Sequence, residues 1–431
     1  MARGLHSGAH MNPKQRIALA AGTFLLLAVL AGLGWWHHSG QAAPGRAAGT
    51  LTVDVTSPND LGPGTLREAL FIVAAATGKA NVLIKTKSIT LKTGLPPLMN
   101  LHGVRIIGES PGVEIDAQGL ADAPVFDVTG DNTSLEGLVL RNCRAAAILL
   151  RAAHFHLQSS TIESCDVGVE VAESASSVLL ERNRFANDRV GVRFTAPNRD
   201  TVVAGNSFIQ DKVAGLWAVR GDAGPRGNAS ARGGGTITVR DNHFNGDGSG
   251  VVAGNVAILV ERNDFANAPN GAVHLVGSGA VIRGNHIGGE APMGIIAENA
   301  RDAIIDGNEL EHLTAYAIMV RGSANALLRA NRVHNCGYGI AFVLGDPAHP
   351  STAVENTIIE PKFNGIDVIG DSPILRRNQV LQPHLFALHV VDFQQPGAQN
   401  VRSQPFLEGN NFRADALQVD NAPVPATARP Q

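Results

Sequence analysis

Asp367 and His389 are the residues best suited to chemistry, a carboxylate and an imidazole that lie 22 positions apart in the sequence. A carboxylate beside an imidazole raises the pKa of the ring and orients it, as in a general acid–base pair. The pair is therefore a candidate catalytic site. A surface ion pair without a chemical role is the alternative, and the sequence leaves both interpretations open.

Other side chains suit the binding of a sugar or of an acidic group. Trp217 precedes a Gly-rich insertion that contains Arg220, and an exposed indole beside a guanidinium can stack on a sugar ring and hold a carboxylate. A harmless flexible insertion is the alternative. His154 and His156 have no further ligand at metal spacing, so we predict neither a metal nor a cofactor. The candidate substrate-binding residues are Trp217, Arg220, His274, Asp346, His349, Lys362 and Asp371.

The elements that must position these residues are repeats of about 22 residues. A phrase of apolar and polar residues that ends in Asn and another apolar residue recurs, as in "LLERNRF" (Leu179–Phe185), and Leu138 and Ser160 take the Asn position in two earlier copies. A second phrase, Gly or Ala followed by apolar–x–apolar, comes eight or nine residues later. Both phrases alternate with period two, which predicts short strands with one buried face. The repeated asparagines are Asn183, Asn206, Asn242, Asn263, Asn285, Asn308, Asn331, Asn356 and Asn378.

Two repeat architectures have a period of this length. A leucine-rich repeat would need a helical segment in each unit, but the second phrase is a strand and leaves no room for one. A parallel β-helix winds each repeat through about three short strands, with coils stacked ~4.8 Å apart. We therefore expect an all-β parallel β-helix. Each Asn should lie at a corner in the left-handed conformation, and the stacked amides should form a hydrogen-bonded ladder.

In this fold the middle residue of each apolar–x–apolar phrase points outward and lies beside its equivalents in neighbouring coils. Asp367 and His389 then fall on adjacent coils, with Cα atoms ~5 Å apart. Trp217 and His274 belong to the same row, and Asp346, His349, Lys362 and Asp371 are expected in turns on nearby coils. The full row is Leu149, Glu170, Arg193, Trp217, Val252, His274, Ile296, Met319, Ala341, Asp367, His389 and Gln418.

The N-terminal part has a different character. Residues 17–36 are uncharged, follow the basic segment 1–16, and are long enough to cross a bilayer, which predicts a signal anchor with a cytoplasmic N-terminus. A cleaved signal peptide is the alternative. Residues 37–49 are a linker, 50–420 the β-helix and 421–431 a disordered tail. Thr65 and Glu68 form a capping box for a short helix with the apolar stripe Leu66, Leu70, Val73 and Ala74, which should cover the first coil.

Two N-terminal stretches carry a family resemblance. "VTSPNDLGPGTLREAL" (Val55–Leu70) is similar to the N-terminal cap of exported proteins in the pectate-lyase-like superfamily, and "VRIIGESPGVEIDAQG" (Val104–Gly119) resembles their first coils. The resemblance implies a right-handed parallel β-helix over roughly residues 50–420. The superfamily contains lyases, hydrolases, epimerases and proteins without known activity, so the resemblance predicts a fold and leaves the reaction open.

These observations predict an exported, membrane-anchored protein that binds a cell-envelope or extracellular polysaccharide or assists its processing. A polysaccharide lyase, hydrolase or epimerase is the alternative, and a protein-binding envelope scaffold is a further one. The expected location is the bacterial inner membrane with the β-helix in the periplasm, or secretion after cleavage. The net charge of −3 gives no basis for nucleic-acid binding. Cys143 and Cys165 should stack as neighbouring buried thiols, and Cys336 at the same repeat position should be a buried thiol too.

Overall fold

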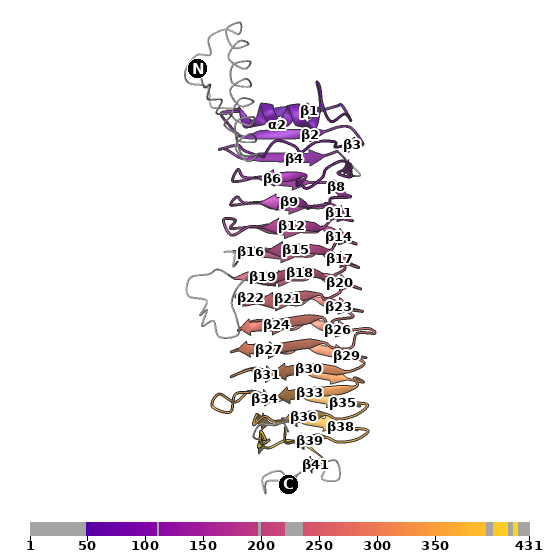
Figure 1. Ribbon diagram of the computed structural model, residues 1–431, viewed down its shortest axis with the longest axis vertical. Helices are drawn as coiled ribbons and strands as arrows, with labels where there is room; N and C mark the ends of the chain where they lie inside the picture. The colour runs from indigo at the N-terminus through magenta and orange to yellow at the C-terminus, as the bar shows by residue number, and fades with distance from the viewer. Residues whose placement is uncertain are drawn as a thin grey trace, which may run out of the picture. The chain divides into compact units, whose positions relative to one another are not determined.

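The computed structural model describes residues 49–109, 112–196, 200–219, 236–393, 400–412 and 417–420. Within these residues, the chain forms a column of stacked coils whose named strands all pair in parallel (Figure 1). The predicted cytoplasmic segment 1–16, the anchor 17–36, most of the linker 37–49, Arg220 and the tail 421–431 lie outside the described residues. No helix in the described ranges is both long enough and apolar enough to span a membrane.

The strands form three parallel sheets, named A, B and C in the order in which each coil visits them, so the described residues confirm the predicted β-helix with three strands per coil. Sheet A contains β1 (Leu51–Val55), β2 (Ala80–Ile84), β4 (Val104–Gly108), β7 (Ser134–Glu136), β10 (His156–Gln158), β13 (Leu179–Glu181), β16 (Thr201–Ala204), β19 (Ile237–Arg240), β22 (Ile258–Glu261), β25 (Val281–Arg283), β28 (Ile304–Asp306), β31 (Leu327–Arg329), β34 (Thr352–Val354), β37 (Ile374–Arg376) and β40 (Phe406–Glu408).

Sheets B and C complete each coil. Sheet B contains β3 (Ser88–Thr90), β5 (Val113–Asp116), β8 (Leu138–Arg141), β11 (Thr161–Glu163), β14 (Arg184–Ala186), β17 (Ser207–Ile209), β20 (His243–Asn245), β23 (Asp264–Ala266), β26 (His286–Gly288), β29 (Glu309–Glu311), β32 (Arg332–His334), β35 (Thr357–Ile359) and β38 (Gln379–Leu381). Sheet C contains β6 (Phe126–Val128), β9 (Ala146–Leu150), β12 (Val167–Val171), β15 (Val190–Phe194), β18 (Ala214–Val219), β21 (Val251–Gly254), β24 (Val273–Ser278), β27 (Ile295–Arg301), β30 (Tyr316–Arg321), β33 (Tyr338–Val343), β36 (Ile366–Ile369), β39 (Leu388–Val391) and β41 (Leu417–Asp420).

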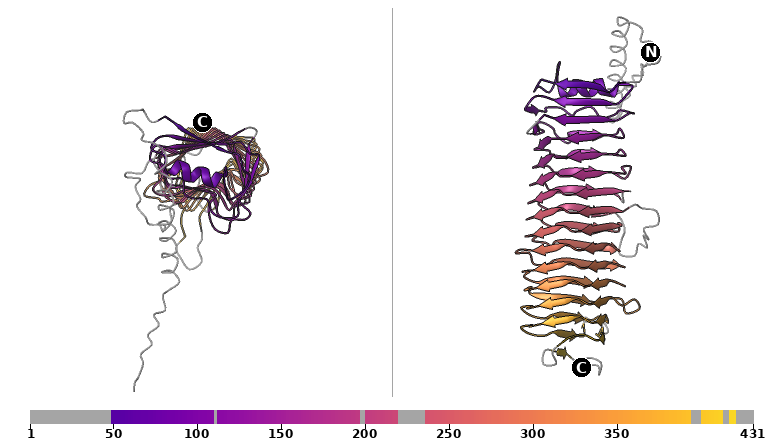
Figure 2. Two further views of the ribbon diagram at one scale, coloured as in Figure 1. Left: turned by 90° about the horizontal axis from the view of Figure 1, so that it is seen from above. Right: turned by 180° about the vertical axis from the view of Figure 1, so that it is seen from behind.

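Helix α2 (Leu66–Ala74) lies across the open N-terminal end of the coil, as the sequence predicts (Figure 2). Its buried side is Leu66, Ala69, Leu70 and Val73, so Ala69 takes the place that we assigned to Ala74. The Thr65 hydroxyl accepts from the Glu68 N–H, but Glu68 Oε2 accepts from the N–H of Gly64 and not from that of Thr65. The capping box is therefore present in a form shifted by one residue.

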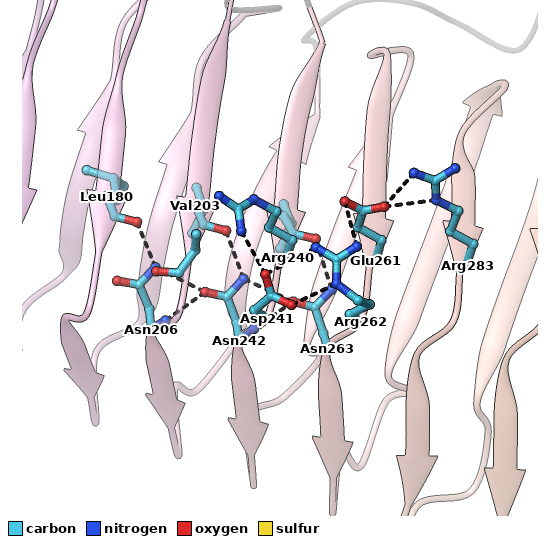
Figure 3. Close-up of polar contacts among 12 residues, drawn as sticks. Leu180, Val203, Asn206, Arg240, Asp241, Asn242, Glu261, Arg262, Asn263 and Arg283 are labelled. Atoms are coloured by element: carbon cyan, nitrogen blue, oxygen red, sulfur yellow. Dashed lines mark hydrogen bonds and ion pairs between the residues drawn. The ribbon is translucent and has the colours of Figure 1, made fainter.

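The predicted asparagine ladder lies at the corner between sheets A and B. Asn242 Nδ2 donates to Val203 O at 2.9 Å and to Asn263 Oδ1 at 3.0 Å, and this pattern repeats from coil to coil (Figure 3). The ladder runs from Asn183 to Asn410, a further member that follows Asn378 by 32 residues. The left-handed residue is not the asparagine but the residue before it, such as Arg262 at φ 52°. Because the amide must point inward to bond, the preceding residue makes the turn.

The interior is filled by equivalent apolar residues from each coil. Four phenylalanines on sheet B stack face to face with ring centroids 4.6–4.9 Å apart. Elsewhere in the interior, Cys143 and Cys165 on neighbouring coils are joined by a disulfide, so the expectation of two thiols is wrong. Cys336 is a buried thiol as expected, and burial raises its pKa to about 11. The stacked phenylalanines are Phe185, Phe208, Phe244 and Phe265.

Candidate functional site

The contact between Asp367 and His389 is present on the outward face of sheet C. The two residues are register partners on β36 and β39, and His389 Nδ1 lies 3.0 Å from Asp367 Oδ1. With a carboxylate as acceptor, Nδ1 carries the hydrogen, and Nε2 is then the basic nitrogen of the neutral ring. The pair thus has the geometry of an oriented imidazole base.

Asp367 faces outward but is not exposed, which corrects the assumption that outward residues meet solvent. It is 2% exposed because the side chains of neighbouring coils close over it. Asn364 Nδ2 donates to its Oδ1 at 2.8 Å, and the Tyr316 hydroxyl donates to its Oδ2 at 3.1 Å from two coils away. Burial, followed by the charge of Asp367, raises the pKa of Tyr316 well above its usual range, so the phenol keeps its hydrogen. These three bonds hold the Asp367 carboxylate in one orientation against the His389 ring.

Aromatic rings surround this pair. Tyr316 stacks on Tyr338 with centroids 4.5 Å apart, Tyr338 stacks on Phe363 at 4.8 Å, and Phe386 lies 5.8 Å from the His389 ring. Phe363 is 41% exposed. Sequence reasoning missed these rings, although Tyr316 and Tyr338 are the chain's two tyrosines and lie one repeat apart, just before the second phrase.

The remaining members of the outward row lie where the sequence placed them but at a distance from this pair. Registers connect Trp217 to Asp367 through six coil steps, or ~29 Å at ~4.8 Å per step. His274 lies between them, half-buried, with Nε2 3.6 Å from Glu298 Oε2. The row is less open than expected, because Val252 is 6% and Ala341 0% exposed. Arg220 is not among the described residues.

The four turn residues of the predicted cluster divide between the two ends of the sheet C strands. Lys362 is exposed in the turn before β36, whereas Asp371 is buried after it, with Oδ1 accepting from the Ser372 N–H at 2.6 Å. Asp346 and His349 bond to each other at 2.9 Å in the turn after β33. Lys362 therefore lies at the same corner of the coil as Tyr316 and Asn364. The other three residues of the cluster lie at the opposite corner.

A second group of titratable residues lies on the outward face of sheet B. Asp264 accepts from His243 Nδ1 and from His286 Nδ1, both at 2.8 Å, and His286 Nε2 is 3.2 Å from Glu311 Oε1. Burial acts to raise the pKa of Asp264, but the bonds from both imidazoles outweigh it and leave that pKa below its usual value. The Asp264 contact raises the pKa of His286. In the sequence, His243, Asp264 and His286 each directly follow an asparagine of the ladder. This position was not among the signals from which we predicted a site.

These imidazoles border a cleft of ≈ 650 Å³ at the corner between sheets A and B. Gly205 and Gly284 place no side chain at two positions of its lining, and Asp241 and Arg262 line it as an ion pair with Nε 2.9 Å from Oδ1. Figure 3 shows this pair continuing toward Glu261 and Arg283 in an alternating row of guanidinium and carboxylate groups. The cleft charges are therefore largely neutralised within the protein.

Two family profiles match the chain. The family described as "Right handed beta helix region" matches residues 227–380, and the family described as "Periplasmic copper-binding protein (NosD)" matches residues 122–217. The chain is a right-handed β-helix repeat protein. None of the curated protein sequences is a significant match to it.

Solved structures of a phage protein resemble this β-helix. A double mutant of the tailspike protein of E. coli bacteriophage HK620, in complex with a pentasaccharide, is 12% identical over 84% of this chain and 78% of its own, with a TM-score of 0.54. Another double mutant of the same tailspike is 13% identical, with the same coverage and a TM-score of 0.55. At this identity the likeness shows the fold alone.

The second family's description raises the question of a copper site. In the part of the chain that the structure describes, no three His, Cys, Asp or Glu side chains are grouped so that they could hold a metal. Within the matched segment, His156 Nε2 instead contacts Glu181 Oε1 at 3.1 Å. The described residues do not fit a copper centre, so no chemistry is assigned through a metal.

Proposed function

We propose that this right-handed β-helix binds an extended polysaccharide along the outward face of sheet C. The observation that carries the proposal is the group of Tyr338, Phe363 and Phe386 around the Asp367–His389 pair. Aromatic surface with a few fixed polar groups is the usual composition of a ligand site. Sugars combine apolar ring faces with hydroxyl groups, and this site offers partners for both.

The same face can accommodate a long chain. Trp217 and His389 bracket a row that includes the half-buried aliphatic side chains of Ile296 and Met319. An elongated ligand lying across the coils would contact one row residue every ~4.8 Å. The tailspike of similar fold is described in complex with a pentasaccharide, which supports a glycan as the ligand class.

A processing reaction is the second candidate, and the bond between Asp367 and His389 favours it. Glycoside hydrolases typically need two carboxyl groups at the scissile bond. In the described part of the chain, Asp367 is buried and hydrogen-bonded to an imidazole, an amide and a phenol, so its carboxylate is not open to a substrate as one of these two groups. The arrangement suits proton abstraction by His389, as a lyase or an epimerase requires, better than hydrolysis.

We further propose that the protein is exported and acts in the periplasm or outside the cell. The periplasmic description of the family that matches residues 122–217 supports this location. Residues 17–36 would anchor the chain in the bacterial inner membrane or serve as a cleaved signal. Membrane fractionation with N-terminal sequencing distinguishes the two, since cleavage leaves a soluble form without this segment.

Binding to a panel of acidic and neutral polysaccharides tests the function. Phe363→Ala should weaken binding to the recognised polymer roughly tenfold, because an aromatic contact is worth about 1.4 kcal/mol. Phe406→Ala is the matched control, since Phe406 is also exposed, at 50%, but lies on sheet A. Equal affinity of the two variants, or no binding to any polymer, contradicts the proposal.

Product formation in the same samples tests the second candidate. If His389 is a base, His389→Gln should reduce turnover by ~10²–10⁴-fold while binding changes much less. Binding without turnover in the native protein leaves the first proposal standing and removes the second.

A further inference from the structure

The corner between sheets B and C contains three stacked carboxyl groups that take no part in the proposed binding. Asp188, Asp211 and Asp247 occupy equivalent positions in successive coils, and each is 0% exposed. The N–H of Asp188 donates to Asp211 Oδ1 at 2.9 Å, and the N–H of Asp211 donates to Asp247 Oδ1 at 2.8 Å. The N–H of Cys165 donates to Asp188 Oδ1 at 2.7 Å, so one oxygen of each carboxyl belongs to a ladder.

The other oxygen of each carboxyl has no partner. Among the described residues, Oδ2 of Asp188, Asp211 and Asp247 is buried without a hydrogen bond. Asp211 Oδ2 lies against the backbone of Gly191, where an added Cβ would be only 2.7 Å away. An ionised carboxylate in such a place lacks both water and a counter-ion, whereas a neutral carboxyl costs far less to bury.

Few charges act on the stack. Glu163 opposes the ionisation of Asp188 and Lys212 favours it, while Arg184 favours the ionisation of Asp211. The nearby Asp166 is paired with Arg189 at 2.6 Å.

Burial outweighs these charges. It is the largest cause of the raised pKa values, which are about 8 for Asp188, 9 for Asp211 and 7 for Asp247. Asp188 and Asp247 also raise the pKa of Asp211 between them, so the three groups titrate as a coupled set.

We propose that Asp188, Asp211 and Asp247 form a pH-sensitive stack that holds the middle coils together while protonated and loosens them when it ionises. The sign follows from proton binding. In the unfolded chain these carboxyls ionise near pH 3.8, so above that pH the folded chain holds more protons than the unfolded one. The contribution of these three carboxyls to stability is therefore complete below about pH 4 and falls as the pH rises, until the folded groups have ionised near pH 9.

The position of the stack in the fold determines which coils a rise in pH should loosen. Asp188, Asp211 and Asp247 lie in the turns that lead into β15, β18 and β21, and β18 carries Trp217. Alkaline pH should thus loosen the part of sheet C around Trp217 and leave the coils of Asp367 intact. The inference does not depend on what the protein binds.

Urea unfolding of the native protein and of Asp211→Asn, at about pH 5, 6 and 7, tests the proposal. Each protonated carboxyl releases one proton on unfolding, so each contributes a roughly tenfold rise in the unfolding equilibrium constant per pH unit. Asp211→Asn removes one such group. The factor by which the unfolding equilibrium constant rises per pH unit should therefore be roughly ten times smaller in the variant than in the native protein. Asp166→Asn is the control, because its ion pair lowers the pKa of Asp166 and keeps it charged in both states. An unchanged slope in Asp211→Asn overturns the proposal.

Infrared spectroscopy of the native protein gives a test that needs no variant to fold. Protonated carboxyl groups have a carbonyl stretching band distinct from that of carboxylates. The band should be present at about pH 6 and disappear by about pH 10, whereas ordinary Asp and Glu are already ionised at the lower value. A spectrum without the band at about pH 6 refutes the stack.

Discussion

Asn263 lies in the middle of the asparagine ladder, and its truncation measures what the ladder contributes to stability. Its Nδ2 donates to Val239 O at 2.9 Å and to Asn285 Oδ1 at 3.0 Å. Its Oδ1 accepts from the N–H and from the Nδ2 of Asn242, both at 3.0 Å. Asn263→Ala removes all four bonds from a site that is 2% exposed.

The magnitude follows from the groups left behind. The Asn242 N–H loses its acceptor in a place where water cannot replace it. Asn242 Nδ2 keeps its bond to Val203 O, and Asn285 Oδ1 keeps the bond from the Asn263 N–H. Four bonds at about 1 kcal/mol each predict that the free energy of unfolding falls by about 4 kcal/mol.

Equilibrium urea unfolding, monitored by far-ultraviolet circular dichroism, measures this loss of stability. Hydrogen exchange at the Asn242 amide shows whether the loss is local to this coil. Asn270→Ala is the matched control, because Asn270 is an exposed turn residue whose replacement should change stability by less than ~0.5 kcal/mol. A loss below ~1 kcal/mol for Asn263→Ala, or a protected Asn242 amide, would refute the reasoning.

Two further predictions concern packing and pH. Phe244→Ala should lower the free energy of unfolding by about 3–5 kcal/mol in urea unfolding, because its ring stacks between two others in the interior, and a loss near 1 kcal/mol would contradict this. The contact with Asp264 raises the pKa of His286, so its stabilisation is present below about pH 6.5 and is lost as the pH rises through the raised value. His286→Gln should therefore destabilise the protein at about pH 5.5, by less than ~1 kcal/mol because the pair is exposed, and should match the native protein at about pH 9, while the exposed His102→Gln shows no such difference.

The sequence by itself determined the coil and its registers. Period-two alternation shows which residues of a strand face inward, and a repeat near 22 residues aligns each strand with the next. From these two local signals follow the outward row from Leu149 to His389, the ladder from Asn183 to Asn378, and the contact between Asp367 and His389. The signals suffice because parallel pairing in successive coils repeats a local geometry, so sequence distance converts directly into spatial distance.

Only the tertiary structure decided how side chains reach beyond their own coil. Tyr316 bonds to Asp367 from 51 residues away and so buries a carboxylate that its position in the strand makes outward-facing. The orphaned oxygens of Asp188 and its two equivalents depend in the same way on how tightly three corners stack. Period and spacing fix where a Cα lies, but the length of a side chain, its rotamer and the gap left by a small neighbour such as Ala341 decide which groups meet and which lose water.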